Sequence, residues 1–241
     1  MSYSPKEFWD RRLSEHFDLR GTGETGLSLA YNRACYALRR EVLERALRGA
    51  GVDPRGRDVL DVGCGTGFFT AYYLERGARV TGVDIAPTAV ERLRARFPGA
   101  RFVQADVGAE DLEGTWDLVN AFDVLYHIVD DARWEAAVRR LGAATRPGGS
   151  LLDTDTFAAL GAIATHNRMR PLAEYRRVLE PLGFDLGAPW PTHVLLNREL
   201  GAFRFLNRAP WLLLPLDRAL LALGCGGGER INKLLVAKRR G

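Results

Sequence analysis

The chain has 241 residues, of which 46% are hydrophobic and 27% are charged. This composition is ordinary for a globular protein and excludes wholesale disorder, and the length suffices for one domain with a full core. The formal charge of +4 permits an anionic partner without requiring one. The cysteines Cys35, Cys64 and Cys225 lie far apart, so we expect neither a disulfide framework nor a metal site.

The N-terminal region predicts two helices, over Pro5–His16 and Leu27–Leu47. The second has apolar residues mostly at three- and four-residue steps, which is typical of a helix with one buried face. A glycine-rich loop at 19–26 separates them. The first residues lack the apolar core of a signal peptide, and no apolar run reaches the roughly 20 residues of a spanning helix. We therefore expect a soluble, cytoplasmic protein.

The most informative motif lies at residues 59–70. An apolar run ends at Asp61, a turn with glycines at Gly63, Gly65 and Gly67 follows, and a helix is predicted to run to Arg76. Strand, glycine turn and helix form the nucleotide site of open α/β sheets, because glycine lets the backbone approach a ligand and the helix N-terminus offers free N–H groups.

Two phosphate-binding interpretations of this turn are disfavoured. A P-loop requires a lysine that is absent, and a dinucleotide site requires a small residue where Phe68 stands. The carboxylate of Asp61 would also face a pyrophosphate unfavourably, whereas it suits a cationic ligand.

Two further acids follow predicted strands. The strand at 79–83 ends at Asp84-Ile85, and the strand at 101–105 ends at Asp106-Val107. Asp84 follows Gly65 by 19 residues, close to where open α/β sheets place the acid that accepts hydrogen bonds from ribose hydroxyls. Each acid alone could be a helix cap or a turn residue. Because the carboxyl ends of parallel strands meet at one edge, the three acids together predict a single site.

The alternation of strands and helices continues along the chain. A strand at 116–122, a helix at 132–141, and a Pro-Gly-Gly turn at 147–149 leading into a strand at 151–155 predict a parallel, doubly wound sheet. A helix at 171–182 follows. A strand near Thr192–Leu196 and a last strand at Ile231–Lys238 are expected to complete the sheet as an antiparallel pair.

Because Asp61 precedes a Gly-x-Gly-x-Gly turn and a Pro-Gly-Gly turn follows later, the chain resembles the class I S-adenosylmethionine (SAM) methyltransferase family. The resemblance implies an α/β fold with a Rossmann-like, doubly wound sheet of about seven strands, mostly parallel with an antiparallel last strand. It also implies one domain with an N-terminal helical cap (1–56), a SAM-binding core (57–157) and a substrate-side part (158–241) with a helical insertion at 198–228. Specific motifs cover only about residues 57–157.

The resemblance further implies SAM as cofactor and S-adenosyl-L-homocysteine as product. In the family, the acid after the third strand accepts a hydrogen bond from the adenine amino group. Carried onto this sequence, the cofactor-binding residues are Asp61, Gly63, Cys64, Gly65, Gly67, Asp84, Ile85, Asp106, Val107 and Phe122.

Methyl transfer requires placement of the acceptor atom in line with the leaving sulfur, and a hydroxyl acceptor also benefits from a base. His127, just past the fourth strand, is the first candidate base, and His166 is the second. The alternative is that His127 holds its loop or packs beside the cofactor. The arginines Arg168 and Arg170 could bind a carboxylate or phosphate of the acceptor, or form a solvated basic loop.

In the N-terminal cap, the candidate acceptor-binding residues are Tyr31, Trp9, Arg12 and Asn32. The alternative for Trp9 and Tyr31 is simple packing. The apolar insertion at 198–228 could line an acceptor pocket, touch a membrane surface, form a homodimer contact or pack on the sheet.

Missing motifs narrow the acceptor. The stretch 120–123 lacks the Pro-Pro sequence of amino-N methylating enzymes, no cysteine stands near the ends of the later strands, and no nucleic-acid module is present. We therefore expect O-methylation of a small, hydrophobic or glycosylated secondary metabolite and no nucleic-acid partner. N- or C-methylation, a nucleic-acid or protein methyltransferase, and a non-catalytic SAM-binding protein are the alternatives.

Overall fold

The computed structural model describes residues 4–196 and 200–241, so Arg198, where the predicted insertion begins, lies outside the described residues. The main sheet has the order β3-β2-β1-β4-β5-β10-β8, and β10 is antiparallel to both of its neighbours. This confirms the predicted, mostly parallel sheet with an antiparallel last strand. The strands are β1 (Asp58–Val62), β2 (Arg79–Asp84), β3 (Arg101–Gln104), β4 (Trp116–Ala121), β5 (Thr145–Asp155), β8 (Phe184–Leu186) and β10 (Lys233–Arg239), with β9 (Trp190–Pro191) pairing beside β10.

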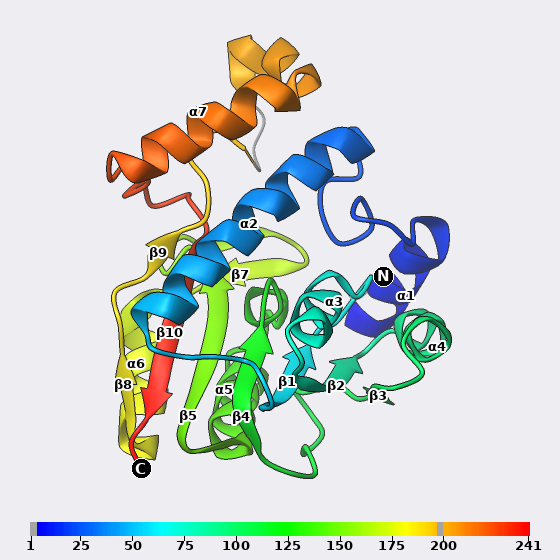
Figure 1. Ribbon diagram of the computed structural model, residues 1–241, viewed down its shortest axis with the longest axis vertical. Coiled ribbons are helices and arrows are strands. Elements are labelled where there is room, and N and C mark those ends of the chain that lie inside the picture. Colours follow the sequence, from blue (N-terminus) through cyan, green and yellow to red (C-terminus); the bar gives the residue numbers. More distant parts are fainter. Residues whose placement is uncertain (1–3, 197–199) are drawn as a thin grey trace.

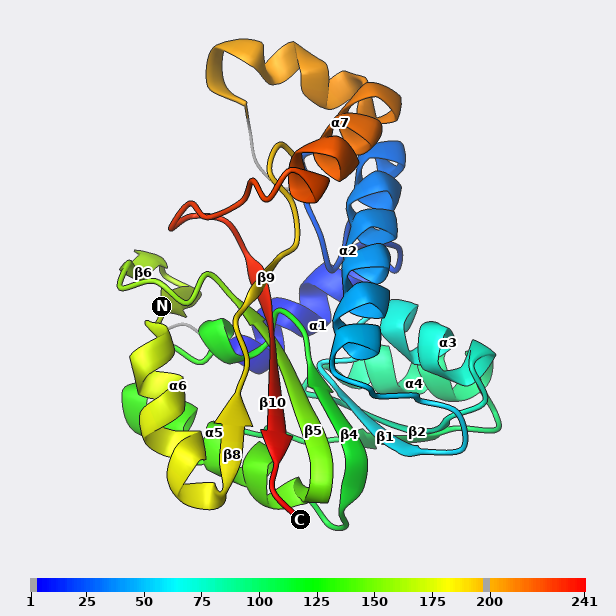
Figure 2. The same ribbon diagram turned by 60° about the vertical axis from the view of Figure 1, so that its left-hand side comes forward.

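Helices cover both faces of the sheet (Figures 1 and 2). One core contains Trp134, Tyr175 and Phe184 between the sheet and α5 and α6, and the other contains Leu43 and Tyr73 between the sheet and α2 and α3. The helices are α1 (Pro5–Glu15), α2 (Leu29–Gly49), α3 (Phe68–Glu75), α4 (Pro87–Arg96), α5 (Asp131–Ala144) and α6 (Leu172–Leu179).

Side-chain caps explain where several helices begin. Ser28 accepts a hydrogen bond from the N–H of Tyr31 at 3.1 Å, and Asp130 accepts one from the N–H of Arg133 at 2.8 Å. Each cap satisfies one of the N–H groups that a helix start leaves unpaired.

The strand order reverses at β1, which pairs with β2 on one side and with β4 on the other. Connections leave in opposite directions at such a point, so a crevice opens beyond the carboxyl ends of these strands. Asp61 and Asp84 lie at the carboxyl ends of β1 and β2, and Asp106 follows the end of β3 by two residues. The fold therefore brings the three acids to one edge.

The predicted strand at Thr192–Leu196 is wrong, and β8 takes its place beside β10. Three N–H groups of this segment bind a side chain instead of a neighbouring strand. The Asp217 carboxylate accepts hydrogen bonds from Val194 (2.9 Å), Leu195 (2.6 Å) and Leu196 (2.8 Å). Asp217 is fully buried, so this segment is fixed by a carboxylate that lies more than 20 residues further along the chain.

We expect Asp217→Ala to lower the free energy of unfolding by about 3 kcal/mol, because it leaves these N–H groups buried without an acceptor. Urea denaturation measures this loss. The matched control is Asp185→Ala, which removes an exposed ion pair with Arg240 and should cost less than about 1 kcal/mol. Equal losses in the two variants would contradict the structural role of Asp217.

Two further elements were not predicted in this form. A hairpin of β6 (Gly161–Ala164) and β7 (Asn167–Met169) follows β5, and its turn carries His166. Within the predicted insertion, η3 (Gly201–Arg208) and α7 (Pro210–Ala222) form an arm that packs on α2 at one end of the molecule (Figure 1).

Candidate active site

A pocket of about 470 Å³ lies at the carboxyl edge of β1, β2 and β4. It is lined by both candidate histidines, His127 and His166, and by all but one of the predicted cofactor residues. These are Asp61, Gly63, Cys64, Gly65, Asp84, Ile85, Asp106, Val107 and Phe122. Predicted site residues from six separate positions along the chain (61–65, 84–85, 106–107, 122, 127 and 166) thus share one cavity.

The glycine turn forms one wall of the pocket. Gly63 and Gly65 adopt φ values of 65° and 51°, which side chains other than glycine rarely adopt. A Cβ on Gly63 would lie 2.3 Å from the Val124 side chain, and one on Gly65 would lie 2.5 Å from Thr22. The turn therefore presents bare backbone to the pocket.

Gly67 corrects the prediction for this motif. Its Cβ would lie 2.6 Å from the side chain of Leu93 on α4, and Gly67 is not part of the pocket wall. This glycine allows α3 to begin with a left-handed N-cap against α4 rather than contacting a ligand.

Asp84 joins the glycine turn to the end of β2. Its Oδ2 accepts a hydrogen bond from the N–H of Gly65 at 2.8 Å, and its Oδ1 accepts one from the N–H of Ala86 at 2.9 Å. Burial raises the pKa of this carboxyl group, although both hydrogen bonds oppose the shift. Each carboxylate oxygen has a second lone pair, so Asp84 can still accept from ligand hydroxyls.

Asp61 is buried among neutral partners. It accepts hydrogen bonds from Thr70 Oγ1 at 2.6 Å and from Asn120 Nδ2 at 2.8 Å, and Tyr73 Oη in turn donates to Asn120 at 3.1 Å. Burial raises the pKa of Asp61 to about 6 despite these hydrogen bonds. A positively charged ligand would stabilise the ionised form of this carboxyl group.

Asp106 has a cationic neighbour that sequence reasoning missed. Arg133 Nη2 donates to its Oδ2 at 2.5 Å, and the N–H of Gly108 donates to its Oδ1 at 2.9 Å. Arg133 stands in the first turn of α5 and also lines the pocket. Nothing in the local sequence of α5 shows that this turn reaches the loop after β3.

His127 is held in one tautomer. Its Nδ1 lies 2.8 Å from the carbonyl oxygen of His166, which can only accept, so Nδ1 carries the proton and Nε2 is a free acceptor in the neutral ring. Trp9 meets the ring edge-on with centroids 4.8 Å apart. Burial lowers the pKa of His127 to about 4, so the ring is neutral at physiological pH.

A partly buried ion pair lies near His127. Arg39 of α2 pairs with Asp123, whose carboxylate also accepts from Thr154 Oγ1 at 3.0 Å and from Asn232 Nδ2 at 2.8 Å. Burial alone would raise the pKa of Asp123, but Arg39 and these hydrogen bonds lower it below its usual value. Both members of the pair line the pocket, and neither was predicted as a site residue.

Of the predicted acceptor-binding residues, Tyr31, Arg168 and Arg170 do not line the pocket. Tyr31 is fully buried in the cluster where α2 packs against Leu213 of α7. Arg170 is 4% exposed and donates to Asp131 Oδ1 at 2.9 Å, and Arg168 pairs with the other oxygen of the same carboxylate at 2.9 Å. The two guanidinium groups hold the hairpin to α5 instead of facing an acceptor.

Of the other cap residues, Trp9 and Arg12 line the pocket and Asn32 does not. Arg12 donates to the carbonyl oxygens of Gly21 and Gly23 and so fastens the loop after α1. Asn32 accepts from the N–H of Glu24 at 2.8 Å and closes the same loop from its other side.

Over the residues that the structure describes, no group of three or more His, Cys, Asp or Glu side chains is arranged to hold a metal ion. Within the same residues, no helix has the length and apolarity needed to cross a bilayer.

This is an open α/β fold with a pocket at the switch point of the strand order, where such sheets bind their ligands. Comparison with known proteins shows what this part of the chain is similar to. Residues 59–149 match the family model described as a methyltransferase domain. Over these residues the match agrees with the predicted resemblance to the class I SAM-dependent methyltransferases.

Relatives of known sequence include a ubiquinone biosynthesis O-methyltransferase of Pseudomonas paraeruginosa, 39% identical over 102 residues, 40% of this chain and 43% of that protein. A malonyl-[acyl-carrier protein] O-methyltransferase of Serratia marcescens is 36% identical over 133 residues, 54% of this chain and 48% of that protein. The chain thus spans less than half the length of either relative.

Solved structures are similar over almost the whole chain. A magnesium protoporphyrin IX methyltransferase of Synechocystis PCC 6803 with bound SAH has a TM-score of 0.63, 18% identity and 97% coverage of both chains. An N-methyltransferase of Bradyrhizobium japonicum in complex with S-adenosyl-L-homocysteine has a TM-score of 0.64, 14% identity and 98% coverage of both chains. At these identities the similarity establishes the fold.

Proposed function

We propose that this chain binds SAM in the pocket and methylates a hydroxyl oxygen of a small-molecule acceptor. The residues present fit the cofactor. Asp84 can accept from the ribose hydroxyls, Asp106 can accept from the adenine amino group, and Asp61 places negative charge where a cationic ligand would lie. The bare glycine turn allows the close backbone approach that such a ligand needs.

When bound, SAM supplies an activated methyl group on a sulfonium. The protein must then orient the acceptor, exclude water and accept a proton. Trp9 and Met169 line the pocket together with His127, so the space beside this histidine is partly apolar. His127 Nε2 would take the hydroxyl proton of the acceptor, whose oxygen would receive the methyl group as its bond to the sulfonium sulfur breaks.

The observation that most directly supports methylation of a hydroxyl group is the fixed, neutral tautomer of His127. A neutral acceptor nitrogen pairs with an O–H donor, whereas a carbon acceptor would offer it no such bond. The names of the two relatives, both O-methyltransferases, support the same reaction. The aromatic wall formed by Trp9 and Tyr126 favours an acceptor with an apolar or aromatic body.

A panel of acceptors with SAM carrying a labelled methyl group tests this proposal. Phenols and hydroxylated aromatic acids should accept the label, and matched anilines should accept it at least about tenfold more slowly, since they lack the acidic O–H. Mass spectrometry identifies the methylated atom. Labelling of the anilines alone would overturn the O-methyltransferase assignment while leaving SAM binding intact.

The pKa of Asp61 predicts how SAM affinity depends on pH. This carboxyl group is neutral below about 6 and ionised above it. Because the ionised form attracts a cationic ligand, SAM affinity should rise as pH increases from about 5 to 7. The rise should be up to about tenfold for each unit by which bound SAM lowers the pKa of Asp61. Calorimetry at several pH values measures the slope.

The matched control for this prediction is Asp61→Asn, which keeps the shape and one acceptor oxygen but cannot titrate. Its SAM affinity should change little over the same pH range. An equal slope in the wild type and in Asp61→Asn would assign the pH dependence to another group.

A further inference from the structure

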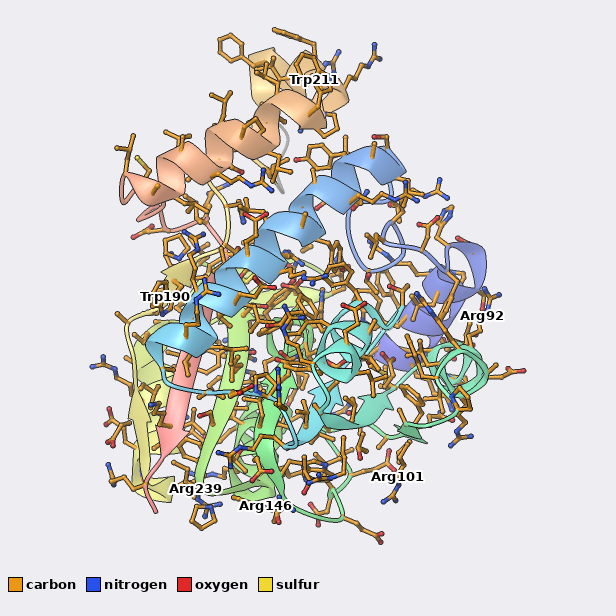
Figure 3. The ribbon with its side chains drawn as sticks, viewed as in Figure 1. Arg92, Arg101, Arg146, Trp190, Trp211 and Arg239 are labelled. Carbon is orange, nitrogen blue, oxygen red and sulfur yellow. The ribbon has the colours of Figure 1, made fainter. Side chains whose placement is uncertain are left out.

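The outer surface of the arm carries large apolar side chains in water. Trp211 is 76% exposed, Phe203 62% and Phe205 61%, and the two phenylalanine rings lie 6.3 Å apart. Figure 3 shows Trp211 at the extremity of the molecule, pointing away from the body. We call Phe203, Arg204, Phe205, Arg208, Trp211 and Leu216 the arm face.

The arm does not need this face in order to fold. Its inner side already packs through Leu213 against Tyr31 and Leu38 of α2, and the buried Asp217 carboxylate fixes the neighbouring segment. Soluble monomers rarely expose a contiguous apolar patch unless it binds something. We therefore expect the arm face to bind a partner.

The charge of the arm face indicates which kind of partner it binds. Between residues 200 and 222 the only acid is Asp217, which is buried and engaged. Arg204 and Arg208 are exposed, and neither forms an ion pair with a described residue, whereas Arg218 pairs with Glu41. The arm face thus combines exposed aromatic side chains with two exposed cationic groups.

We propose that the arm face docks peripherally on an anionic lipid surface. Aromatic and leucine side chains enter the interfacial zone, and Arg204 and Arg208 meet the anionic headgroups. The helix α7, with 13 residues and Pro215 inside it, is too short to span a bilayer and suited to lie along its surface. This proposal does not depend on the chemistry proposed for the pocket.

A second copy of the chain fits the same surface less well. In a two-fold dimer each arm face would meet its own equivalent, which would bring arginines together with no exposed acid of the arm to pair with them. An anionic membrane supplies the opposite charge across the whole face.

Docking would also orient the pocket. α7 packs on α2, and α2 contributes Tyr36 and Arg39 to the pocket wall. The lipid surface would therefore lie beyond the α2 side of the site, which packs against the arm through the cluster around Tyr31.

Vesicle flotation of the full chain tests the proposal, with phosphatidylcholine vesicles that contain either no or about 30% phosphatidylglycerol. Wild-type protein should float with the anionic vesicles and not with the neutral ones, and raising salt from about 0.1 to 0.5 M should reduce binding severalfold. Trp211→Ser with Phe205→Ser, and separately Arg204→Glu with Arg208→Glu, should each lower the partition coefficient by about tenfold or more.

The matched controls make equal changes elsewhere. Ile163→Ser removes an apolar side chain that is 56% exposed on β6, and Arg55→Glu with Arg101→Glu reverses two exposed charges outside the arm. Figure 3 shows Arg101 at the opposite end of the molecule from Trp211. These variants should bind vesicles as the wild type does, and thermal melting checks that every variant is folded.

Three results would overturn the proposal. They are failure of the wild type to bind anionic vesicles, equal loss of binding in the arm variants and the controls, and a dimer in sedimentation velocity that Trp211→Ser dissociates. The last result would assign the arm face to a second copy of the chain.

Discussion

Replacing Asp84 with alanine should weaken SAM binding by at least about 100-fold. The substitution removes the two charge-assisted hydrogen bonds that the carboxylate would accept from the ribose hydroxyls, at roughly 1.5–3 kcal/mol each. The Asp84 carboxylate binds the N–H groups of Gly65 and Ala86 and so shapes the glycine turn itself. In the proposed complex it also accepts from the ribose hydroxyls. Calorimetric titration with SAM measures the loss.

The matched control is Asp58→Ala. Asp58 begins β1 at the opposite edge of the sheet, where it pairs with Arg79 and Arg146. Its removal should leave SAM affinity within about threefold of wild type because the pairs are partly exposed and distant from the pocket. Equal losses of affinity in the two variants would show that Asp84 acts only through general stability.

Replacing His127 with alanine should lower kcat by about 10²–10⁴-fold, the usual contribution of a general base, while SAM affinity changes little. The measurement is steady-state turnover at saturating acceptor, with SAM binding followed in parallel. Unchanged turnover would remove His127 as the base and leave it as a packing residue against Trp9.

His166→Ala is the informative comparison for this residue. His166 holds His127 through its backbone carbonyl, which alanine retains, so the tautomer of His127 should survive the substitution. We therefore expect a much smaller loss of kcat than in His127→Ala. A larger loss would identify the His166 side chain as the group that takes the proton.

The lowered pKa of His127 also predicts the shape of the pH profile. A base with a pKa of about 4 is already unprotonated at pH 5, so its acid limb in kcat should lie near 4 instead of near 6.5. The same shift affects stability. Between pH 6.5 and 4 the unfolded chain binds a proton that the folded chain does not, so the His127 contribution to stability decreases as pH falls through this range.

The cofactor side of the site was predictable because its residues are local in sequence. Asp61, Gly63 and Gly65 are separated by a few residues, and strand, turn and helix follow one another directly. Asp84 and Asp106 stand at or just after strand ends, and parallel topology alone brings such positions to one edge. Gly67 belongs to the same motif, but its contact with Leu93 depends on where α4 packs.

The acceptor side was not predictable, because it depends on which face of α2 meets which neighbour. Tyr31 and Leu38 face the arm, whereas Tyr36 and Arg39 face the pocket. All four residues fit a helical pattern, and the local sequence does not show which face of α2 meets the arm and which meets the pocket. The Arg39–Asp123 pair joins residues 84 positions apart.

The strand expected at Thr192–Leu196 shows how a distant contact overrides local preference. The stretch is rich in β-branched and aliphatic residues, which favours a strand. The Asp217 carboxylate takes up three of its N–H groups, and no strand ladder can then form through them.

The pocket at the β1, β2 and β4 edge is proposed to bind SAM and to serve methyl transfer. Titration of the protein with SAM and, separately, with NADH, followed by incubation with methyl-labelled SAM and a phenolic acceptor, tests it most directly. We predict SAM binding without NADH binding, and label recovered on the acceptor oxygen. Binding of NADH but not SAM, or SAM binding with no label on any acceptor, would contradict this function.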